Sequence, residues 1–510
     1  MELHERIFEL ALSRSFFFPS NEPYGSVSGF YDYGPVGKLV KNKIENLWRK
    51  MFIRELGFHE VETSIITPSI VLEASGHVGS FADPVFECEK CKTKVRADTF
   101  AGKEITKTEA AKGGKEFQWD GKVDSLTEAA NTYSLKCPNC KTQFTKAFMF
   151  NLMFKTGIGG EQTPAYSRPE TAQGIFTSFP RLFRNHGTKL PLGIGQIGKS
   201  FRNEISPRKG LVRMREFTQM ELEYFFNPSK PDFELFETVA NEKMRMKIDG
   251  KITTKSAKEL VDEKIVPNQI FAYFLAIQWK FYKLCGLDEN KMHLRVLPKS
   301  EVPHYSSGNV DMEVETSHGT IEISGNAYRT DFDLSQHAKV SKQDLSVFVE
   351  EEKKKIVPHV FEVSMGVDRL FFCMLEHSFK EKDQKDETGN WKLGTQKEWE
   401  WFNFTPLVSP YSVAIFPLMK KDGLAEKGYS IACSLRGDMD VFYQESGSIG
   451  RRYARCDEIG IPYAVTIDYD TMKDDTVTVR YRQNGAQERV KISELHEKIV
   501  NNIRDNRVSL

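Results

Sequence analysis

Residues 190–226 alternate apolar and polar side chains on either side of a turn rich in proline, glycine and arginine, 206–210. Alternation with a period of two places neighbouring side chains on opposite faces of a strand, so the segment predicts a hairpin of two long antiparallel strands. The stretch Lys199–Glu216 carries six Lys and Arg side chains against two carboxylates. The turn of the predicted hairpin is therefore strongly basic.

The two arms of this hairpin bring together side chains that suit a nucleoside triphosphate. Alternation puts Arg202 and Glu204 on one face of the first arm, and Arg213 and Phe217 on one face of the returning arm. Arginine forks bind phosphate oxygens, while a carboxylate accepts hydrogen bonds from an exocyclic amine and an aromatic ring can stack on a base. A solvated, salt-bridged hairpin is the alternative, which a short motif alone leaves open.

A second motif, Gly366-Val367-Asp368-Arg369, lies at a predicted strand-to-helix junction, after Glu362 and Ser364. Glycine permits close approach of the backbone, so an arginine in the first helical turn could reach a terminal phosphate. The alternative is a helix-entry glycine followed by a surface cation.

Other segments outline the organisation of the chain. Apolar residues in Lys38–Glu55 recur at helical spacing and predict a long amphipathic helix. The strand-like run Val61–Ile65 follows, and Pro68 breaks it. Residues 230–300 are expected to be rich in helix. After Pro410, alternating strands and helices predict a separate small α/β domain.

The composition excludes several classes of protein. Seventy-one Lys and Arg balance 71 Asp and Glu among 510 residues, which excludes a strongly basic polyanion binder. At 40% hydrophobic residues the chain can bury large cores and is not disordered. The N-terminus has no apolar signal region, and no window approaches the ~18 uninterrupted apolar residues of a membrane span. We expect a cytoplasmic protein with no membrane partner.

Four of the eight cysteines form two Cys-x-x-Cys pairs, Cys88 with Cys91 and Cys137 with Cys140. This spacing is typical of a metal site rather than of a disulfide framework, and it fits a reducing compartment. Four thiolates leave no open coordination position, so we expect a structural Zn²⁺. Reduced free thiols are the alternative. A redox role is disfavoured because no thioredoxin-like unit surrounds the cysteines.

Together these motifs resemble the three motifs of the class II aminoacyl-tRNA synthetases, in the same order. The resemblance is carried by the helix–strand–Pro68 unit for motif 1, Arg202-x-Glu204 with Arg213-x-x-x-Phe217 for motif 2, and Gly366-x-x-Arg369 for motif 3. Within that class the chain is similar to the homodimeric glycyl-tRNA synthetases in the runs 29–37, 168–174, 202–208 and 215–218. The C-terminal region resembles the anticodon-binding domain shared by the glycyl, histidyl, prolyl and threonyl enzymes.

The resemblance implies an α+β fold, with an antiparallel six-stranded sheet core, helices, inserted modules and a C-terminal α/β anticodon-binding domain. The expected order is the core with motif 1 (1–84), a cysteine-bearing insertion expected to be a zinc module (85–145), the core with motif 2 (146–228), a helical insertion (229–300), the core with motif 3 and a linker (301–400), and the anticodon-binding domain (401–510).

The resemblance also implies a two-step reaction. The carboxylate of glycine attacks the α-phosphate of ATP, and the 3′-terminal ribose of tRNA(Gly) then takes the glycyl group. Arg202 and Arg369 match catalytic positions, and Mg²⁺ would bridge the phosphates of ATP. The positions that match the ATP site are Arg202, Asn203, Glu204, Arg213, Met214, Phe217, Glu322, Ile323, Gly366 and Arg369. Those that match the glycine site are Arg96, Glu170, Glu221, Glu362 and Ser364.

Two other hypotheses compete with this ligase. A non-catalytic, nucleic-acid-binding accessory factor on the same fold would lack the motif arginines, which are present here. A synthetase for another amino acid is disfavoured by the glycine-specific runs. The family resemblance also implies a homodimer formed through motif 1.

Two details refine these expectations. Val363 stands where the family commonly has proline between the glutamate and the serine, and Met365 is large beside the expected glycine pocket, so we expect these departures to affect the pocket's shape. In the C-terminal domain three arginines that could meet phosphate cluster on one predicted helix, and two aromatic residues are candidates for stacking bases. They are Arg451, Arg452 and Arg455, and Phe442 and Tyr443. An ordinary solvated helix face is the alternative.

Overall fold

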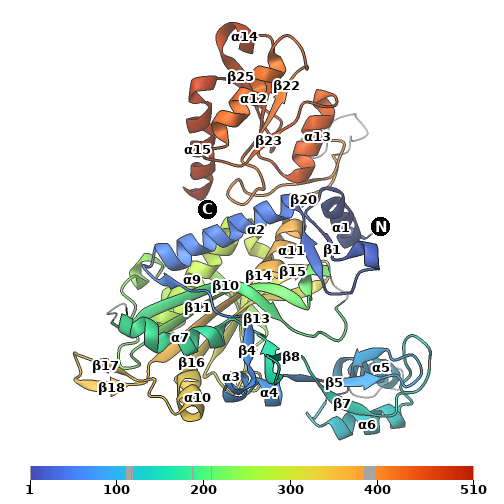
Figure 1. Ribbon diagram of the computed structural model, residues 1–510, viewed down its shortest axis with the longest axis vertical. Coiled ribbons are helices and arrows are strands. Elements are labelled where there is room, and N and C mark those ends of the chain that lie inside the picture. The colour runs from blue at the N-terminus through green and yellow to red at the C-terminus, as the bar shows by residue number, and fades with distance from the viewer. Residues whose placement is uncertain are drawn as a thin grey trace.

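The computed structural model describes residues 2–110, 117, 119–185, 189–207, 210–383 and 397–508. Figure 1 shows a central body built on a large sheet, a smaller body to one side that carries α5 and α6, and a third body above α1 and α2 that ends in α15. These helices are α1 (Leu3–Ser13), α2 (Pro35–Trp48), α5 (Ala97–Ala110), α6 (Val123–Thr132) and α15 (Ile492–Val508). Arg208 and Lys209 of the basic turn, and residues 384–396 of the expected linker, lie outside the described residues.

Nine strands form the central sheet. Their spatial order is β13 (Lys251–Ser256), β12 (Lys243–Ile248), β14 (Met292–Val296), β15 (Asn309–Thr316), β16 (Gly319–Thr330), β19 (His359–Gly366), β11 (Glu216–Phe226), β10 (Leu192–Phe201) and β3 (His59–Glu60). The six inner strands, from β14 to β10, pair with one another in antiparallel fashion throughout, as the resemblance implied. β3 joins β10 in parallel and β12 joins β14 in parallel, so the expected six-stranded sheet is extended at both edges.

The predicted hairpin is observed as β10 and β11, which pair from Leu192 opposite Phe225 to Phe201 opposite Glu216. β11 then pairs with β19, and this register places Glu221 opposite Ser364. The two motifs singled out in the sequence are thus adjacent in the sheet.

Alternation along the strands gives the sheet two different faces. On one face, apolar side chains of β11 and β19, such as Met220, Leu222 and Val363, join a core with the buried sides of α2, α9 and α11. The helices α9 and α11 span Gln269–Leu284 and Val367–Ser378. The helix predicted over Lys38–Glu55 is observed as α2 continued by a π-helical turn, η2 (Arg49–Arg54).

The opposite face is covered only in part. Ile175 and Phe179 of α7 (Ala172–Asn185) pack there against Ile194 and Phe225 of the sheet. The remaining helix of this face is α10 (Phe332–Ser341), whose Leu334 joins the same cluster. The polar residues of β11 and β19 lie beside this cluster, on the uncovered part of the face.

Two sequence-based expectations differ from the structure. Val61–Ile65 is not a strand, because β3 ends at Glu60 and, after one further backbone hydrogen bond from Val61 to Gly195, the chain crosses to a separate three-stranded sheet. That sheet consists of β4 (Ile66–Pro68), β9 (Thr163–Ser167) and β8 (Phe154–Ile158). Residues 229–300 contain α8 (Ala257–Asp262) and α9, but also β12, β13 and β14, so helix is only part of this segment.

The cysteine-bearing segment forms its own small body. Its sheet has the order β6-β5-β7, with β5 (Ala82–Glu87) between β6 (Lys94–Arg96) and β7 (Ala147–Asn151). Phe86, Leu126 and Phe144 are buried at the centre of its core, together with Cys88 and Cys137. It lies at the lower right of Figure 1, below the C-terminal body.

The C-terminal body matches the predicted alternation of strands and helices. Its five-stranded sheet has the order β23 (Val441–Tyr443), β22 (Val413–Pro417), β24 (Tyr463–Ile467), β25 (Thr476–Tyr481) and β26 (Gln487–Lys491). The helices α12 (Leu424–Leu435) and α13 (Ile449–Ile459) connect the parallel strands. Most of its core is separate from that of the central body. None of the described helices combines the length and apolar character that a bilayer-spanning segment requires.

A buried cluster of charges fastens the segment before β22 to this body. Asp457 of α13 accepts two hydrogen bonds of 3.0 Å from Arg480, one on each carboxylate oxygen, and the Nζ of Lys397 lies 3.4 Å from Oδ2. Lys397 also lies 3.3 Å above the ring of Trp401, and burial lowers the pKa of its ammonium to about 8. Arg482 lies close by and donates to the carbonyl of Gly460. The carboxylate of Asp457 therefore offsets the charge of several buried cations.

Removing that carboxylate should destabilise the C-terminal body strongly. Asp457→Ala leaves Lys397 and Arg480 buried without their partner, and breaking a buried ion pair in this way typically costs about 3–5 kcal/mol. Urea unfolding followed by hydrogen exchange of residues 413–491 measures the loss. The matched control is Asp470→Ala, which removes an exposed pair with Lys473 and should change the unfolding midpoint little. Equal effects of the two variants would contradict the role assigned to the cluster.

Candidate active site

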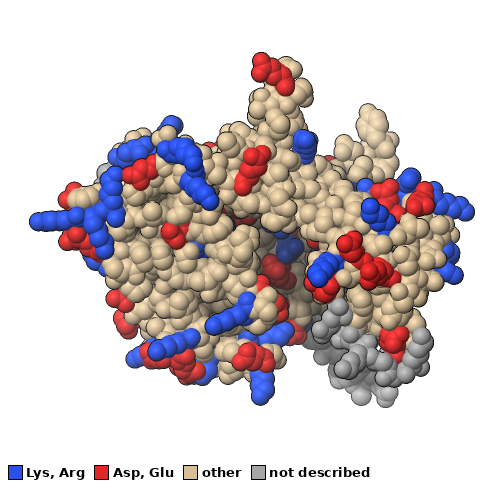
Figure 2. All heavy atoms as spheres, turned by 90° about the horizontal axis from the view of Figure 1, so that it is seen from below, with Lys and Arg blue, Asp and Glu red and all other residues tan. Residues whose placement is uncertain are grey.

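A cavity of about 320 Å³ lies in the central body, on the partly covered face of the sheet. Its walls come from β11, β15, β16 and β19, from the N-terminus of α11, and from the loop between β10 and β11. Figure 2 shows the corresponding side of the molecule hollowed near its centre, with acidic and basic side chains inside the hollow.

Most residues expected at the ATP site line this cavity. They are Arg202, Glu204, Arg213, Met214, Phe217, Glu322, Ile323, Gly366 and Arg369. Asn203 is not among the lining residues; its backbone amide donates to the carbonyl of Leu152 at 2.6 Å. The hairpin and the strand-to-helix junction thus form one wall together.

Arginines dominate one end of the cavity. The guanidinium of Arg202 lies 5.4 Å from the ring of Phe217, and its Nε donates to the carbonyl of Pro169 at 3.3 Å. Arg369 donates to the carbonyls of Glu322 and Val212 at 2.7 and 3.1 Å, and burial lowers the pKa of its guanidinium. A planar ring beside two guanidinium groups suits a base and its phosphates.

Carboxylates dominate the other end, where Glu170, Glu221, Glu362 and Ser364 all line the cavity. Glu221 is held by the hydroxyl of Ser364 at 2.6 Å and by the amide of Thr171 at 2.8 Å. Glu362 accepts from Arg329 at 3.0 Å. These contacts fix the carboxylates in one arrangement.

Burial controls the ionisation of this acidic end. It raises the pKa of Glu362 to about 8, with the Arg329 guanidinium opposing the rise, and it also raises the pKa of Glu221. Glu170 is only partly buried, with 14% of its side chain exposed, and nearby His77 and Arg329 hold its pKa below the usual value against the opposing effect of burial. At neutral pH the acidic end therefore keeps at least one carboxyl protonated. A bound cation would favour its ionised form.

One residue expected at the glycine site lies elsewhere. Arg96 is on β6 of the cysteine-bearing body and is not among the residues that line the cavity. Its guanidinium lies 2.9 Å from a carboxylate oxygen of Asp98 and 3.4 Å from one of Asp83. Two local carboxylates thus hold Arg96 at the edge of its own sheet.

The expectation that Met365 alters the pocket is wrong. Met365 is fully buried in the core on the helix-covered side of β19, as is Val363. Alternation along the strand turns Met365 away from the side occupied by Glu362 and Ser364.

Sequence reasoning missed two residues of the acidic end. Arg329 lies at the end of β16, where it donates to both oxygens of Asp333 at 2.6 and 2.8 Å as well as to Glu362. The position of Arg329 in the sequence gives no signal of this role. Glu223 is fully buried, and neither of its oxygens has a hydrogen-bond partner among the residues that the structure describes. Its position two residues after Glu221 in a predicted strand is a signal that could have found it.

A buried network ties the cavity wall to α2. Asp368 accepts from the amide of Thr218 and from the hydroxyl of Tyr33, both at 2.6 Å. Lys41 of α2 donates to the hydroxyl of Thr218 at 2.6 Å, and burial lowers the pKa of its ammonium. Asp368 and Thr218 adjoin Arg369 and Phe217 in the chain, so this network fixes the backbone of both.

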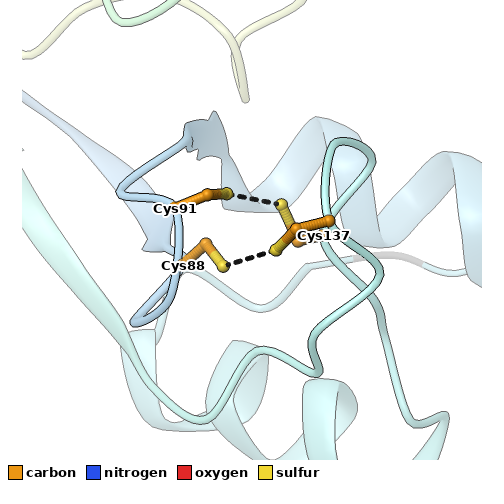
Figure 3. A group of neighbouring side chains, drawn as sticks. Cys88, Cys91 and Cys137 are labelled. Atoms are coloured by element: carbon orange, nitrogen blue, oxygen red, sulfur yellow. Dashed lines mark hydrogen bonds between the residues drawn. The ribbon is translucent and has the colours of Figure 1, made fainter.

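The four paired cysteines meet in the cysteine-bearing body. The Sγ atoms of Cys88 and Cys140 are 3.4 Å apart, and those of Cys91 and Cys137 are 3.6 Å apart (Figure 3). All four Sγ atoms lie within 4.8 Å of one another, so the group could hold a metal ion. The two loops are alike, since Lys92 and Lys141 donate their amides to the carbonyls of Cys88 and Cys137.

In the C-terminal body, the predicted arginine cluster is reduced to two exposed residues, Arg451 and Arg455. Arg452 is buried, because its position on α13 faces the sheet, where it donates to the carbonyl of Pro417 at 2.6 Å. Phe442 and Tyr443 are half-buried. The ring centroids of Phe442 and Tyr411 are 5.3 Å apart, so Phe442 contributes to packing within the protein.

Comparison with known proteins agrees with this geometry. Residues 161–378 match the family "tRNA synthetase class II core domain (G, H, P, S and T)", and residues 412–502 match the family "Anticodon binding domain". A solved prolyl-tRNA synthetase from Cryptosporidium parvum, complexed with halofuginone and AMPPNP, is similar in fold, with a TM-score of 0.57 at 12% identity over 99% of this chain and 78% of that chain. The fold and the matched core define a class II aminoacyl-tRNA synthetase.

More similar relatives narrow the class. A glycine–tRNA ligase of Methanococcus maripaludis is 35% identical, over 97% of this chain and 99% of the relative. One of Pyrococcus horikoshii is 37% identical, over 97% of this chain and 98% of the relative. The chain belongs to the glycine–tRNA ligase family.

Proposed function

We propose that this chain is an ATP-dependent glycine–tRNA ligase, which forms glycyl-adenylate and then transfers the glycyl group to tRNA(Gly). The observation that carries the proposal is the division of one cavity into a guanidinium-rich end and a carboxylate-rich end. ATP would occupy the first and the ammonium of glycine the second, with the reacting atoms between them.

In the first step, a carboxylate oxygen of glycine attacks the α-phosphorus of ATP, and the bond to pyrophosphate breaks. Arg202 would bind the α-phosphate and offset charge in the transition state, an electrostatic role that needs no nucleophilic side chain. Phe217 would stack on adenine, with Glu204 at its amino edge and Met214, Ile323 and Gly366 around it. Arg213 and Arg369 would bind the outer phosphates, and Asn203 would shape the loop through its backbone.

Magnesium is expected with ATP. Glu322 and Asp311 both line the cavity, and burial together with the charge of Glu322 raises the pKa of Asp311 to about 7. Carboxylate oxygens beside a phosphate site suit Mg²⁺, which would neutralise phosphate charge. We propose Glu322 as its protein ligand.

Glycine has no side chain to recognise, so its recognition must rest on the ammonium and on exclusion. Glu170, Glu221 and Glu362 would bind the ammonium, with Ser364 orienting Glu221. One methylene typically changes the free energy of binding in a pocket by only ~1–3 kcal/mol, so rejection of alanine requires rigid pocket walls. The strands that carry Glu221, Glu362 and Ser364 provide such walls.

In the second step, a hydroxyl of the terminal ribose of tRNA attacks the glycyl carbonyl, and AMP leaves. The C-terminal domain, which matches an anticodon-binding family, would bind the distant end of the tRNA. We also propose a homodimer formed through the motif 1 region. Its support is the group of exposed apolar side chains Ile65, Ile66 and Ile70 around β4 and α3 (Ser69–Ala74).

The proposal predicts amino-acid-dependent ATP–pyrophosphate exchange by the purified protein with glycine, and not with alanine or serine. Arg202→Ala should lower the exchange rate by about 10²–10³-fold, because a preorganised transition-state donor is lost. Arg436→Ala, an exposed arginine of the C-terminal body, is the matched control and should leave exchange unchanged. No exchange with any amino acid, from a folded protein that still binds nucleic acid, would favour the accessory factor instead.

Glycine binding should release protons near neutral pH. The pKa of Glu362 is about 8 in the free protein, and a bound ammonium lowers it, so glycine affinity should rise with pH and level off above about 8. Isothermal titration calorimetry at pH 7 in buffers of different ionisation enthalpy counts the protons. In Glu362→Gln the release should diminish. Proton uptake, or a release that the variant does not change, would contradict this assignment.

The cysteine-bearing body should contain one structural Zn²⁺ per chain. Four thiolates at ~2.3 Å from a central ion stand about 3.8 Å apart, which is near the observed sulfur separations. Elemental analysis should find the zinc in wild type and in the control Cys433→Ser, an exposed cysteine. Cys137→Ser should lose it and become sensitive to proteolysis within 85–145. A metal-free wild type that resists proteolysis there would favour free thiols.

A further inference from the structure

The segment Gly76–Phe81, between α3 and β5, touches both ends of the cavity from outside. It contains the short helix α4 (His77–Ser80), and none of its residues is among those that line the cavity. Two of its side chains nevertheless contact residues that do.

His77 contacts the acidic end. Its Nε2 lies 3.4 Å from Oε2 of Glu170, and its Nδ1 lies 2.8 Å from the hydroxyl of Ser75. Ser75 is buried, so the imidazole is fixed from behind. The side-chain amide of Gln173 donates a hydrogen bond to Glu170 at 2.8 Å. His77 and Gln173 together therefore determine where this carboxylate points.

Phe81 contacts the arginine end. The guanidinium of Arg202 lies 5.2 Å from the ring of Phe81 and 5.4 Å from that of Phe217, so two aromatic rings contact it. Its Nε donates to the carbonyl of Pro169, the residue before Glu170. Cation–π contacts restrict the guanidinium without using the N–H groups that would bind phosphate.

The segment itself is anchored by two consecutive residues at the end of β7. The side-chain amide of Asn151 donates to the carbonyl of Val78 at 3.1 Å, and the backbone amide of Leu152 donates to the carbonyl of Phe81 at 3.0 Å. Leu152 in turn accepts from the amide of Asn203, next to Arg202. The imidazole and phenyl groups also contact each other, with ring centroids 5.7 Å apart.

We propose that Gly76–Phe81 is a positioning element for glycine activation, in which His77 orients Glu170 toward the ammonium and Phe81 orients Arg202 toward the α-phosphate. The proposal rests on the proposed function. The attacking carboxylate and the phosphorus meet between Glu170 and Arg202, and small displacements at such a junction slow the reaction strongly. One rigid segment that sets both side chains fixes the separation between the two substrates.

Variants of His77 test the first half, with glycine-dependent exchange as the assay. His77→Leu should raise the KM for glycine about tenfold or more and change the KM for ATP little, because a polar contact that holds the Glu170 carboxylate is lost. His77→Gln keeps a donor and should restore most of the glycine KM. His496→Leu, on an exposed histidine of α15, is the matched control. Equal changes in both KM values, or no rescue by glutamine, would overturn the assignment of His77.

Variants of Phe81 test the second half. Phe81→Leu should lower kcat about 3–30-fold, since the cation–π contact is lost, with the KM for glycine near that of wild type. Phe81→Tyr keeps the ring and should restore kcat. Wild-type kcat in Phe81→Leu, or a loss that tyrosine does not restore, would overturn the assignment of Phe81. Both series are read against wild type, so absence of exchange in wild type itself would reject the proposed function instead.

Discussion

The site depends on the pairing of β11 with β19. This register sets Gln219 opposite Gly366, Glu221 opposite Ser364, and Glu223 opposite Glu362. If either strand slipped by one residue, its polar side chains would turn into the apolar core and its core residues would face the cavity. The register is strongly fixed because the other face of both strands, including Met220 and Met365, is fully buried. The packing of this buried face against α2, α9 and α11 thus fixes the register, and with it the arrangement of charged side chains on the opposite face of the sheet.

The free-energy cost of this arrangement arises mainly at the acidic end of the cavity. Glu221, Glu223 and Glu362 are buried side by side near Asp333, and the principal cation among them is Arg329. Burying charges without full pairing is expensive, so the site keeps some carboxyls protonated rather than ionised. A pocket of this kind favours a small cation over a neutral ligand, which connects its electrostatics to the choice of an amino acid's ammonium.

Much of this could be predicted from the sequence, because the informative residues follow local rules. Strand alternation predicted the β10–β11 hairpin, and the position of Gly366 before Arg369 marked the strand-to-helix junction. The expected shared strand faces are not observed, because β10 ends at Phe201 and β11 begins at Glu216, so Arg202, Glu204 and Arg213 lie in the loop between the two strands. The paired spacing of Cys88 and Cys91 with Cys137 and Cys140 predicted a cluster, and the sulfur atoms meet as expected.

What could not be predicted depends on contacts between distant segments. Arg329 becomes a partner of Glu362 only through the register of β16 with β19, and no local pattern encodes that register. Arg96 is not among the cavity residues because it pairs with Asp83 of the neighbouring strand β5 and with Asp98 of α5 in the cysteine-bearing body. Arg452 is an internal residue because α13 turns it toward the carbonyl end of β22, a choice among helix faces that arginine's polarity alone would not suggest.

The attachment of the cysteine-bearing body has a consequence for how such a chain could arise. Its first strand begins at Ala82 and its last strand ends at Asn151, and these two residues are paired with each other across the sheet. The body therefore leaves and re-enters the central fold at one point. A chain could gain, lose or exchange this whole unit by closing a tight turn there, without altering the order of any strand in the large sheet.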